Sequence, residues 1–338
     1  MSKTTISDIA RALKITPSTV SRALAGNERV SASTRMLVER KALEMGYERN
    51  LLASSLRKGT SDTVGLIVPR VNRLFFSNVI SGVEAMLNPS GYNLIICQSH
   101  ERAEDERRAV MTLMRNQVSG ILISHSLETT DADAFRQMLS AQDVAVIQFD
   151  RAFDGVGNVR VVNDNYECAR TATEHLVKSG YKRIGYMGGD KKSNVYADRL
   201  RGYCDAMRKA ELEIDEAILF DDSITRDKGF FNAARAIERG CDAVYCAGDY
   251  AALGVIEYAR DKGIKIPDAF GVIGTANETF ADVVHPALTT VEQNAFDMGT
   301  AAARAFLDVK AGKIVEEQTI VIPTRLVVRN SCRKQTKK

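Results

Sequence analysis

Apolar residues at the start of the chain recur with the spacing of helices. The first such stripe predicts an amphipathic helix and consists of Ile6, Ile9, Ala10 and Leu13. Thr5 stands directly before this stripe as an N-cap, and Asp8 at the third helical position completes a weak form of the capping box. We therefore expect the first helix to begin after Thr5.

A second helix is expected after a short break. Thr16 can act as its N-cap, and Pro17 suits the first helical position because its missing N–H and fixed φ cost nothing there. The inward-facing residues would be Val20, Ala23 and Leu24. The outer face near the helix start would carry Ser18, Ser21 and Arg22. A recognition helix presents such side chains to base edges in the major groove, and Arg22 is suited to reading a guanine.

A third helix opens after Ser31 or Ser33 and ends at Gly46. Its apolar stripe would consist of Val38, Ala42 and Met45. Three helices in this space form a minimal core, so residues 1–48 are predicted to be a helix-turn-helix DNA-binding domain. The alternative is a helical module that uses the same motif to bind protein.

The basic charge of the chain is concentrated in this head. Residues 1–60 carry a net charge of +6, the remainder carries −3, and the whole chain carries +3. A basic head on a slightly acidic body is what phosphate neutralisation at one end requires. The charge pattern therefore favours DNA as the partner of the head.

Beyond Thr60, short apolar runs alternate with amphipathic segments. The first series of runs is VGLIVP, YNLIIC, GILIS and VAVIQFD, with helical patterns near residues 76–88, 103–116 and 132–140. A second series extends from VRVVND to FGVIG, with helices at 166–178, near 197–209, near 230–239 and at 250–262, and a strand around Ile218. Strands that alternate with helices indicate parallel sheets covered on both faces. Each series is therefore expected to form one doubly wound unit.

The last segments are too few for another domain. They are LTTVEQ, a helix at 295–310, TIVIP and RLVVR. We expect them to complete both sheets, so that several crossings join the two lobes. The predicted fold class is an N-terminal all-α helix-turn-helix head followed by two doubly wound α/β lobes with parallel sheets, of the periplasmic-binding-protein type.

Composition excludes several other classes. The six cysteines lack CxxC or zinc-like spacing and the four histidines are scattered, so we expect no metal site and no cofactor. There is no apolar run of 18 residues, and the start does not resemble a signal peptide, which predicts a cytoplasmic protein. The motifs GxGxxG, GxxxxGK[ST] and GxSxG are missing, so an enzyme is not expected.

The head resembles the LacI/GalR family of bacterial regulators. The family pattern T-I-x-D-[VI]-A followed by VSRxL is matched between Thr5 and Leu24, and GDYAALG and HPALTTVEQ resemble markers of the family's regulatory domain. This second resemblance covers nearly all of residues 62–330. The resemblance implies that DNA is contacted by Thr5, Thr16, Ser18, Thr19, Ser21, Arg22, Ser31 and Tyr47.

The resemblance continues into a hinge helix and linker at residues 49–61. Tyr47 and Asn50 match the residues that lead into the family's hinge, and Ala53 and Leu56 match its alanine and leucine. The leucine of relatives wedges into the minor groove, where an apolar side chain can kink the duplex. Leu56 is expected to do the same by resemblance, and the alternative is that it packs on its own head.

Three positions depart from the family pattern. Lys14 replaces the usual glycine of the turn, and a positive φ there would cost on the order of 1 kcal/mol. Arg49 replaces a frequent proline and Ser54 a common arginine, which changes the phosphate contacts expected of the hinge.

Ligands of doubly wound sheets bind outside the carboxyl ends of the strands. Two such lobes would face each other across a cleft, and the residues at their strand exits are Phe75, Phe76, Asp150, Arg151, Asp164, Asp249 and Asn277. By resemblance, Ser193 and Arg199 match the family's ligand-contacting loop and arginine, and Phe75 and Asp150 match an aromatic platform and a hydroxyl acceptor. The predicted effector site is Phe75, Asp150, Ser193, Arg199, Asp249 and Asn277. Asp249 and Asp164 could instead cap the helices that follow them, and Phe76 could belong to the core.

The sequence allows two classes of ligand for this site, an acidic one and a neutral one. Ala276 stands where the family usually has an aspartate that grips sugar hydroxyls. Its neutrality, together with Arg199 and the pair Lys191 and Lys192, favours an acidic ligand such as a sugar acid or a sugar phosphate. The alternative is a neutral sugar bound by Asn277.

These features predict a ligand-responsive transcriptional regulator, a repressor of carbohydrate-metabolism genes. We expect a homodimer on double-stranded operator DNA, with a small-molecule effector and no membrane partner. The basic tail at 331–338 has no leucine heptad, so a C-terminal coiled coil is not expected. The alternative function is a soluble sugar-binding sensor or carrier that does not act on DNA.

Overall fold

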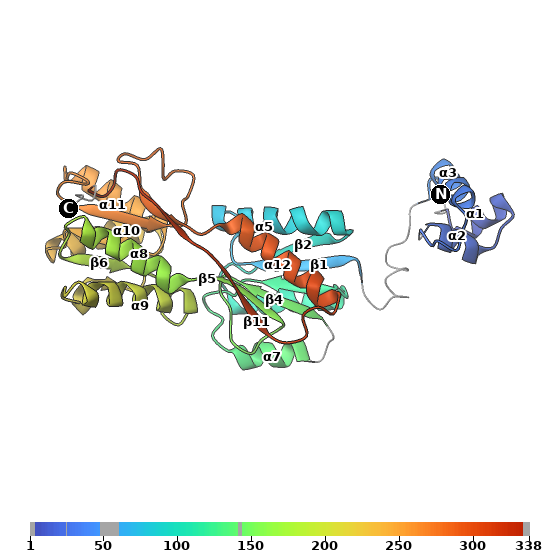
Figure 1. Cartoon of the computed structure of the whole chain (residues 1–338), viewed down its shortest axis with the longest axis horizontal. Helices are drawn as coiled ribbons and strands as arrows, with labels where there is room; N and C mark the ends of the chain where they lie inside the picture. Colours follow the sequence, from blue (N-terminus) through green and yellow to red (C-terminus); the bar gives the residue numbers. More distant parts are fainter. Residues whose placement is uncertain (1–3, 25, 48–60, 141–143, 334–338) are drawn as a thin grey trace. The chain divides into compact units, whose positions relative to one another are not determined.

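The computed structural model describes four stretches of the chain (Figure 1), residues 4–24, 26–47, 61–140 and 144–333. Contacts divide the chain into a head and a body, with the boundary between Ser61 and Asp62. The head is helical, and the body contains helices and two sheets. The predicted hinge residues Asn50, Ala53 and Leu56 lie outside the described residues, as do Arg49 and Ser54.

The head has the predicted helices, which are α1 (Ile6–Leu13), α2 (Pro17–Leu24) and α3 (Ala32–Glu44). Thr5 Oγ1 accepts a hydrogen bond from the Asp8 N–H at 3.3 Å, and Asp8 Oδ2 accepts one from the Thr5 N–H at 3.0 Å. The predicted capping box is therefore confirmed. Ser31, rather than Ser33, caps α3. The core of the head consists of Ile9, Ala10, Val20, Ala23, Val30, Val38 and Ala42.

Residues with positive φ follow the helices of the head. Lys14 follows α1 with φ 54° and ψ 39°, so the left-handed turn considered for this position is present. A side chain in this region costs about 1 kcal/mol relative to glycine. Gly46 adopts φ 60° after α3 without that penalty, and it ends the helix as predicted.

The first sheet of the body defines the N-lobe. Its strand order is β11-β5-β4-β3-β1-β2 and its pairings are parallel. Its strands are β1 (Thr63–Val68), β2 (Asn93–Gln98), β3 (Gly120–Ile123), β4 (Ala145–Phe149), β5 (Val159–Asn163) and β11 (Gln318–Ile322). Its helices are α5 (Leu74–Leu87), the short η1 (Asn88–Ser90), α6 (Ala103–Arg115), α7 (Ala132–Ser140) and α12 (Ala295–Lys310). One apolar core lies under α5 and α12, and another lies under α6 and α7.

The second sheet defines the C-lobe. Its order is β12-β10-β9-β8-β6-β7, and only the β10–β12 pair is antiparallel among the described strands. Its strands are β6 (Ile184–Met187), β7 (Leu219–Phe220), β8 (Ala243–Cys246), β9 (Gly271–Thr275), β10 (Thr289–Glu292) and β12 (Arg325–Val327). Its helices are α8 (Asn165–Lys178), α9 (Asn194–Lys209), η2 (Glu216–Ile218), α10 (Arg226–Glu238) and α11 (Asp249–Asp261). The strand expected around Ile218 begins one residue later, because Ile218 itself ends η2.

Helix α12 returns to the N-lobe and packs closely on α5 (Figure 1). A Cβ atom at Gly82 would meet the Phe296 carbonyl, and one at Gly299 would meet the Val79 carbonyl. Only glycine permits this approach of the two backbones. The late segments therefore complete both lobes, as the sequence predicts.

Within the described body the chain passes between the lobes three times, after β5, after β10 and after β11. One side chain joins these passages. Asn163 Nδ2 donates to the carbonyls of Gln293 at 2.9 Å and Ile322 at 3.0 Å, and Asn163 Oδ1 accepts from Gln293 Nε2 at 3.1 Å. We call Asn163, Gln293 and Ile322 the crossing cluster. It therefore joins the three segments that pass between the lobes.

The described chain ends packed on the C-lobe. Ser331 and Cys332 are buried, and Ser331 Oγ donates to the Val272 carbonyl at 2.6 Å. The start of the segment expected to be a basic tail therefore belongs to the folded body. No helix among the described residues is long and apolar enough to span a lipid bilayer.

Candidate functional site

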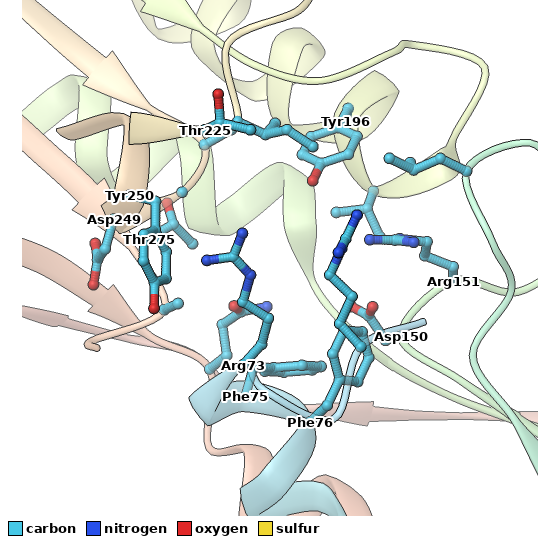
Figure 2. Close-up of a pocket in the computed structure, with 18 of the residues that line it drawn as sticks. Arg73, Phe75, Phe76, Asp150, Arg151, Tyr196, Thr225, Asp249, Tyr250 and Thr275 are labelled. Carbon is cyan, nitrogen blue, oxygen red and sulfur yellow. The ribbon is translucent and has the colours of Figure 1, made fainter. Parts of the chain in front are cut away.

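A cleft of about 370 Å³ lies between the carboxyl ends of the strands of the two lobes (Figure 2). Residues of both lobes line it, including Phe75 and Asp150 of the N-lobe and Arg199 and Asp249 of the C-lobe. These are four of the six residues predicted for the effector site. The volume is ordinary for a small-molecule site, for which about 300–1,000 Å³ is typical.

Arg199 is a buried cation with unused donors. It lies on α9, is 4% exposed, and donates from Nε to Asn165 Oδ1 at 2.9 Å and from Nη1 to the Ala247 carbonyl at 2.8 Å. No carboxylate of the described chain lies within 4 Å of it. A guanidinium has five N–H donors, and both acceptors here are neutral. Arg199 can therefore bind an acceptor in the cleft.

Asp150 is the corresponding buried acceptor. It follows β4 with φ 59° and is 7% exposed, and Ser124 Oγ donates to its Oδ2 at 3.3 Å. Burial raises the pKa of the Asp150 carboxyl, while the nearby charges of Arg151 and Arg199 oppose this shift. A ligand hydroxyl that donates to Asp150 would replace part of the hydration lost on burial.

Arg151 also lines the cleft, but its charge is already compensated. Its Nη1 and Nη2 donate to the two carboxylate oxygens of Glu101 at 2.6 and 3.3 Å, and Nη1 also donates to the His125 carbonyl. The pair forms part of the N-lobe wall. The charge of Arg151 is therefore balanced by Glu101.

Aromatic rings form the apolar part of the cleft. Phe75 and Phe76, at the start of α5, contact each other edge to face with centroids 5.1 Å apart. Phe76 is buried in the N-lobe core, which was its alternative role, and it also reaches the cleft lining. Figure 2 shows Tyr250 and Tyr196 on the C-lobe side of the same space. The cleft thus offers ring faces on both of its walls.

Asp249 supports the C-lobe wall. It is 1% exposed, its Oδ1 accepts from Thr290 Oγ1 at 2.6 Å, and its Oδ2 accepts from the Glu278 N–H at 2.8 Å. These bonds join α11 to β10 and to the loop after β9. Burial raises the pKa of Asp249 to about 6, and the two hydrogen bonds oppose that shift. Asp164, by contrast, caps α8 by accepting from the Glu167 N–H, which was its alternative role.

Two predicted effector residues lie outside the cleft lining. Ser193 precedes α9, and its buried Oγ has no hydrogen-bond partner among the residues that the structure describes. Asn277 donates from Nδ2 to Glu292 at 2.8 Å and accepts from Arg329 Nη2 at 2.7 Å. Ala276, with φ 119°, is the residue of that loop which lines the cleft. Ligand contacts of Ser193 and Asn277 stay predictions.

The main residue that sequence reasoning missed is Arg73. It precedes α5 at the exit of β1, and its guanidinium carbon lies 3.9 Å from the centroid of the Tyr250 ring (Figure 2). The contact spans the cleft from the N-lobe to the C-lobe. The signal in the sequence is a charged residue at the exit of β1, two residues before Phe75.

The outer face of α2 in the head is polar and accessible. Thr16 and Ser18 are exposed and Thr19 is half-buried, and the hydroxyls of Ser18 and Thr19 each form a hydrogen bond of 2.9 Å with Thr16 Oγ1. Arg22 is exposed one turn later. Tyr47 is half-buried beside the core. This face fits a nucleic-acid interface, and its individual contacts stay predictions.

Two family models match the chain. The model of bacterial regulatory proteins of the lacI family matches residues 5–50, and that of a periplasmic binding protein-like domain matches residues 173–332. The chain is 30% identical over 333 residues to the HTH-type transcriptional regulator RegA of Clostridium saccharobutylicum, over 97% of this chain and 99% of that protein.

Solved structures share the fold. The transcriptional regulator CelR in its complex with cellobiose matches with a TM-score of 0.73 and 28% identity, over 97% of this chain and 100% of that chain. The lac repressor dimer bound to operator and the anti-inducer ONPF matches with a TM-score of 0.87 over 98% and 99% of the chains. At 23% identity the second likeness concerns the fold alone. The fold class predicted from the sequence is confirmed.

Proposed function

This chain belongs to the lacI family of bacterial regulatory proteins, and from that premise we propose that it is a repressor whose affinity for operator DNA is set by a small molecule in the cleft. The observation that carries the proposal is the presence, in one chain, of a helix-turn-helix head and a ligand-sized cleft. A carrier without DNA function has no use for the head. Cytoplasmic localisation and the lack of an enzymatic role follow from the same proposal.

The head would read DNA through α2. Its exposed residues, Thr16, Ser18 and Arg22, stand where a recognition helix enters the major groove. Ser21 and Thr19 are half-buried beside them, and Thr5 and Ser31 stand at the amino ends of their helices, where exposed backbone N–H groups attract phosphate. We assign base readout to Arg22 and positioning on phosphates to the hydroxyl residues.

The effector would be a polyhydroxylated molecule. A sugar has apolar faces that stack on a ring such as Phe75, and hydroxyls that donate to Asp150 and accept from Arg199. CelR, a relative of similar fold, was solved with cellobiose. We therefore place carbohydrates and their derivatives first among the candidate ligands.

The link from the cleft to the lobe arrangement would be a chain of hydrogen bonds. Arg199 donates to Asn165, and Asn165 Nδ2 donates to the Asn163 carbonyl at 3.4 Å. Asn163 belongs to the crossing cluster. A ligand that holds Arg199 in one position would bias the turning of the lobes, and differential affinity for two lobe arrangements is what linkage requires.

We propose a homodimer as the DNA-binding species. One short recognition helix is too small a reader for a specific site. Strand β2 is also an edge of the N-lobe sheet, and Ile95 and Ile96 on it are exposed. Exposed apolar residues on an edge strand are typical of a protein interface, and we propose that a second copy of the chain buries them. Sedimentation that finds only monomers at micromolar concentration, with and without DNA, would contradict this.

The test of the proposed function uses the full chain. Specific DNA is first selected from a random-sequence library, and its affinity is measured by fluorescence anisotropy. Candidate ligands are found by thermal shift, since a ligand stabilises by RT ln(1 + [L]/Kd). We expect a stabilising ligand to change operator affinity. The proposal fails if no selected sequence binds more tightly than random DNA, or if cleft ligands leave DNA affinity unchanged.

A further inference from the structure

We propose that the effector of this cleft carries an anionic group, a carboxylate or a phosphate ester, and that the Arg73 guanidinium binds it. This inference rests on the proposed function, because it names the chemical class of the ligand for the same cleft. Of the two ligand classes that the sequence allows, an acidic ligand and a neutral sugar, we favour the acidic one.

The position of Arg73 prepares it for an anion. Its guanidinium carbon lies 3.9 Å from the centroid of the Tyr250 ring, and no carboxylate of the described chain lies within 4 Å of the guanidinium. A stacked guanidinium uses its flat face, whereas its N–H donors point outward in the plane. Tyr250 therefore orients Arg73 without consuming the donors that bind a carboxylate or phosphate through two hydrogen bonds.

The carboxylates of the cleft do not compensate this charge. Glu101 forms an ion pair with Arg151. Asp222 forms one with Lys228. Both oxygens of Asp249 accept hydrogen bonds from neutral donors of the C-lobe. Asp150 also lines the cleft, where burial raises the pKa of its carboxyl and the charges of Arg151 and Arg199 already act on it.

Glu278 is the carboxylate that competes most directly for Arg73. The charge of Arg73 acts on Glu278, yet burial raises the pKa of the Glu278 carboxyl and so disfavours its charged form. No oxygen of Glu278 approaches Arg73 within 4 Å. An incoming ligand anion would therefore meet a cation whose charge is not already neutralised.

Two further cations reinforce the same polarity. Arg199 has only the neutral partners Asn165 and Ala247, and Arg70, which also lines the cleft, is exposed and forms no ion pair within the described chain. The loop after β9 presents the neutral Thr275 and Ala276 to the cleft. Within the described chain, Arg70, Arg73 and Arg199 thus line the cleft without a carboxylate partner, whereas burial raises the pKa of the carboxyls of Asp150 and Glu278.

The test begins with simple anions as probes of the full-length protein. Inorganic phosphate and acetate are titrated separately while the Arg Nε–H signals are followed by NMR, and sodium chloride at equal ionic strength is the control. The variants are Arg73→Gln, Arg73→Lys, Tyr250→Leu and, as a matched control on the exposed face of α6, Arg107→Gln. Circular dichroism checks that each variant is folded.

We expect one of the probes to shift the Arg73 signal saturably beyond the effect of sodium chloride. The affinity should fall at least about tenfold in Arg73→Gln, since a charge-assisted hydrogen bond contributes that much or more. It should fall less in Arg73→Lys, which keeps the charge, and should be unchanged in Arg107→Gln. A preference for phosphate indicates a phosphate ester, and a preference for acetate indicates a sugar acid.

A second experiment compares a neutral sugar, glucose, with two acidic derivatives, glucuronate and glucose 6-phosphate. Binding to the protein and release of operator DNA are measured for each. The inference is overturned if neither anion probe binds beyond the salt control, if Arg73→Gln binds them as wild type does, or if the neutral member of a pair binds as well as its acidic partners. Operator release by a neutral sugar without anion binding would refute the inference and leave the proposed function intact. Anion binding at Arg73 without any effect on DNA affinity would support the anion site and contradict the proposed function.

Discussion

Replacing Asn163 by alanine tests how the two lobes are held. Asn163 is 4% exposed, and its amide makes three hydrogen bonds of 2.9–3.1 Å to Gln293 and Ile322. A buried hydrogen bond contributes about 1 kcal/mol, and buried partners left unsatisfied add to the loss. Water admitted to the space would recover part of it. We therefore expect Asn163→Ala to lower the free energy of unfolding of the body by about 2–4 kcal/mol.

The assay is guanidinium unfolding of the full chain, followed by a probe in the body because the head can unfold separately. Asn158→Ala is the matched control. Asn158 Oδ1 accepts one hydrogen bond, from the Val146 N–H at 2.8 Å, within the N-lobe, so its loss should cost about 1 kcal/mol. Asn163→Ala should also weaken the effect of a cleft ligand on operator affinity, whereas Asn158→Ala should preserve it. The reasoning would be refuted if Asn163→Ala lost no more free energy of unfolding than Asn158→Ala and its operator affinity responded normally to the ligand.

Further substitutions test the head and the C-lobe wall. Lys14→Gly should stabilise the head by about 1 kcal/mol, because φ 54° favours glycine, and slower amide exchange in α1 would report it. Arg22→Ala should cost roughly 1–3 kcal/mol per contact at one base pair of each half-site, and equal weakening on operator and random DNA would reduce Arg22 to a phosphate contact. Asp249 has a folded pKa of about 6, above the usual 3.8, so its burial favours the protonated form. The stability it contributes is complete below about pH 4 and is lost as pH rises through 6, a change of about 3 kcal/mol at most. Between about pH 4 and pH 6, the free energy of unfolding of Asp249→Asn should depend less on pH than that of the wild type. An unchanged dependence on pH would exclude Asp249 as its source.

Local signals in the sequence are sufficient for the helices of the head and for the alternation of strands and helices in the two lobes. The capping box at Thr5 involves residues three positions apart, and alternating strands and helices leave few topologies. The strain at Lys14 was also accessible, because a missing glycine at a helix end has a local cause. Such features depend on neighbours in the chain.

The composition of the cleft wall depends instead on contacts between distant segments. Asn277 does not line the cleft, and its amide is held by Glu292 and by Arg329, which lies 52 residues later in the chain. Ala276 faces the cleft because its φ of 119° rotates the loop, and periodicity cannot reveal such an angle. The role of Arg73 depends on Tyr250 in the other lobe. The strand-exit rule locates the cleft, but not which side chain at each exit points into it.

The central claim is that a ligand in the cleft controls operator binding, and Arg199→Ala tests it most directly. Operator affinity of the full-length variant is measured by anisotropy with and without a ligand that shifts operator affinity of the wild type, alongside the melting temperature. Arg199 lines the cleft and is part of the body, so we expect ligand-free operator affinity within about twofold of wild type and loss of a coupling that typically lies between about 5-fold and 150-fold. Arg199→Lys guards against a variant that fails to fold. A stable Arg199 variant with a normal ligand response would contradict the account.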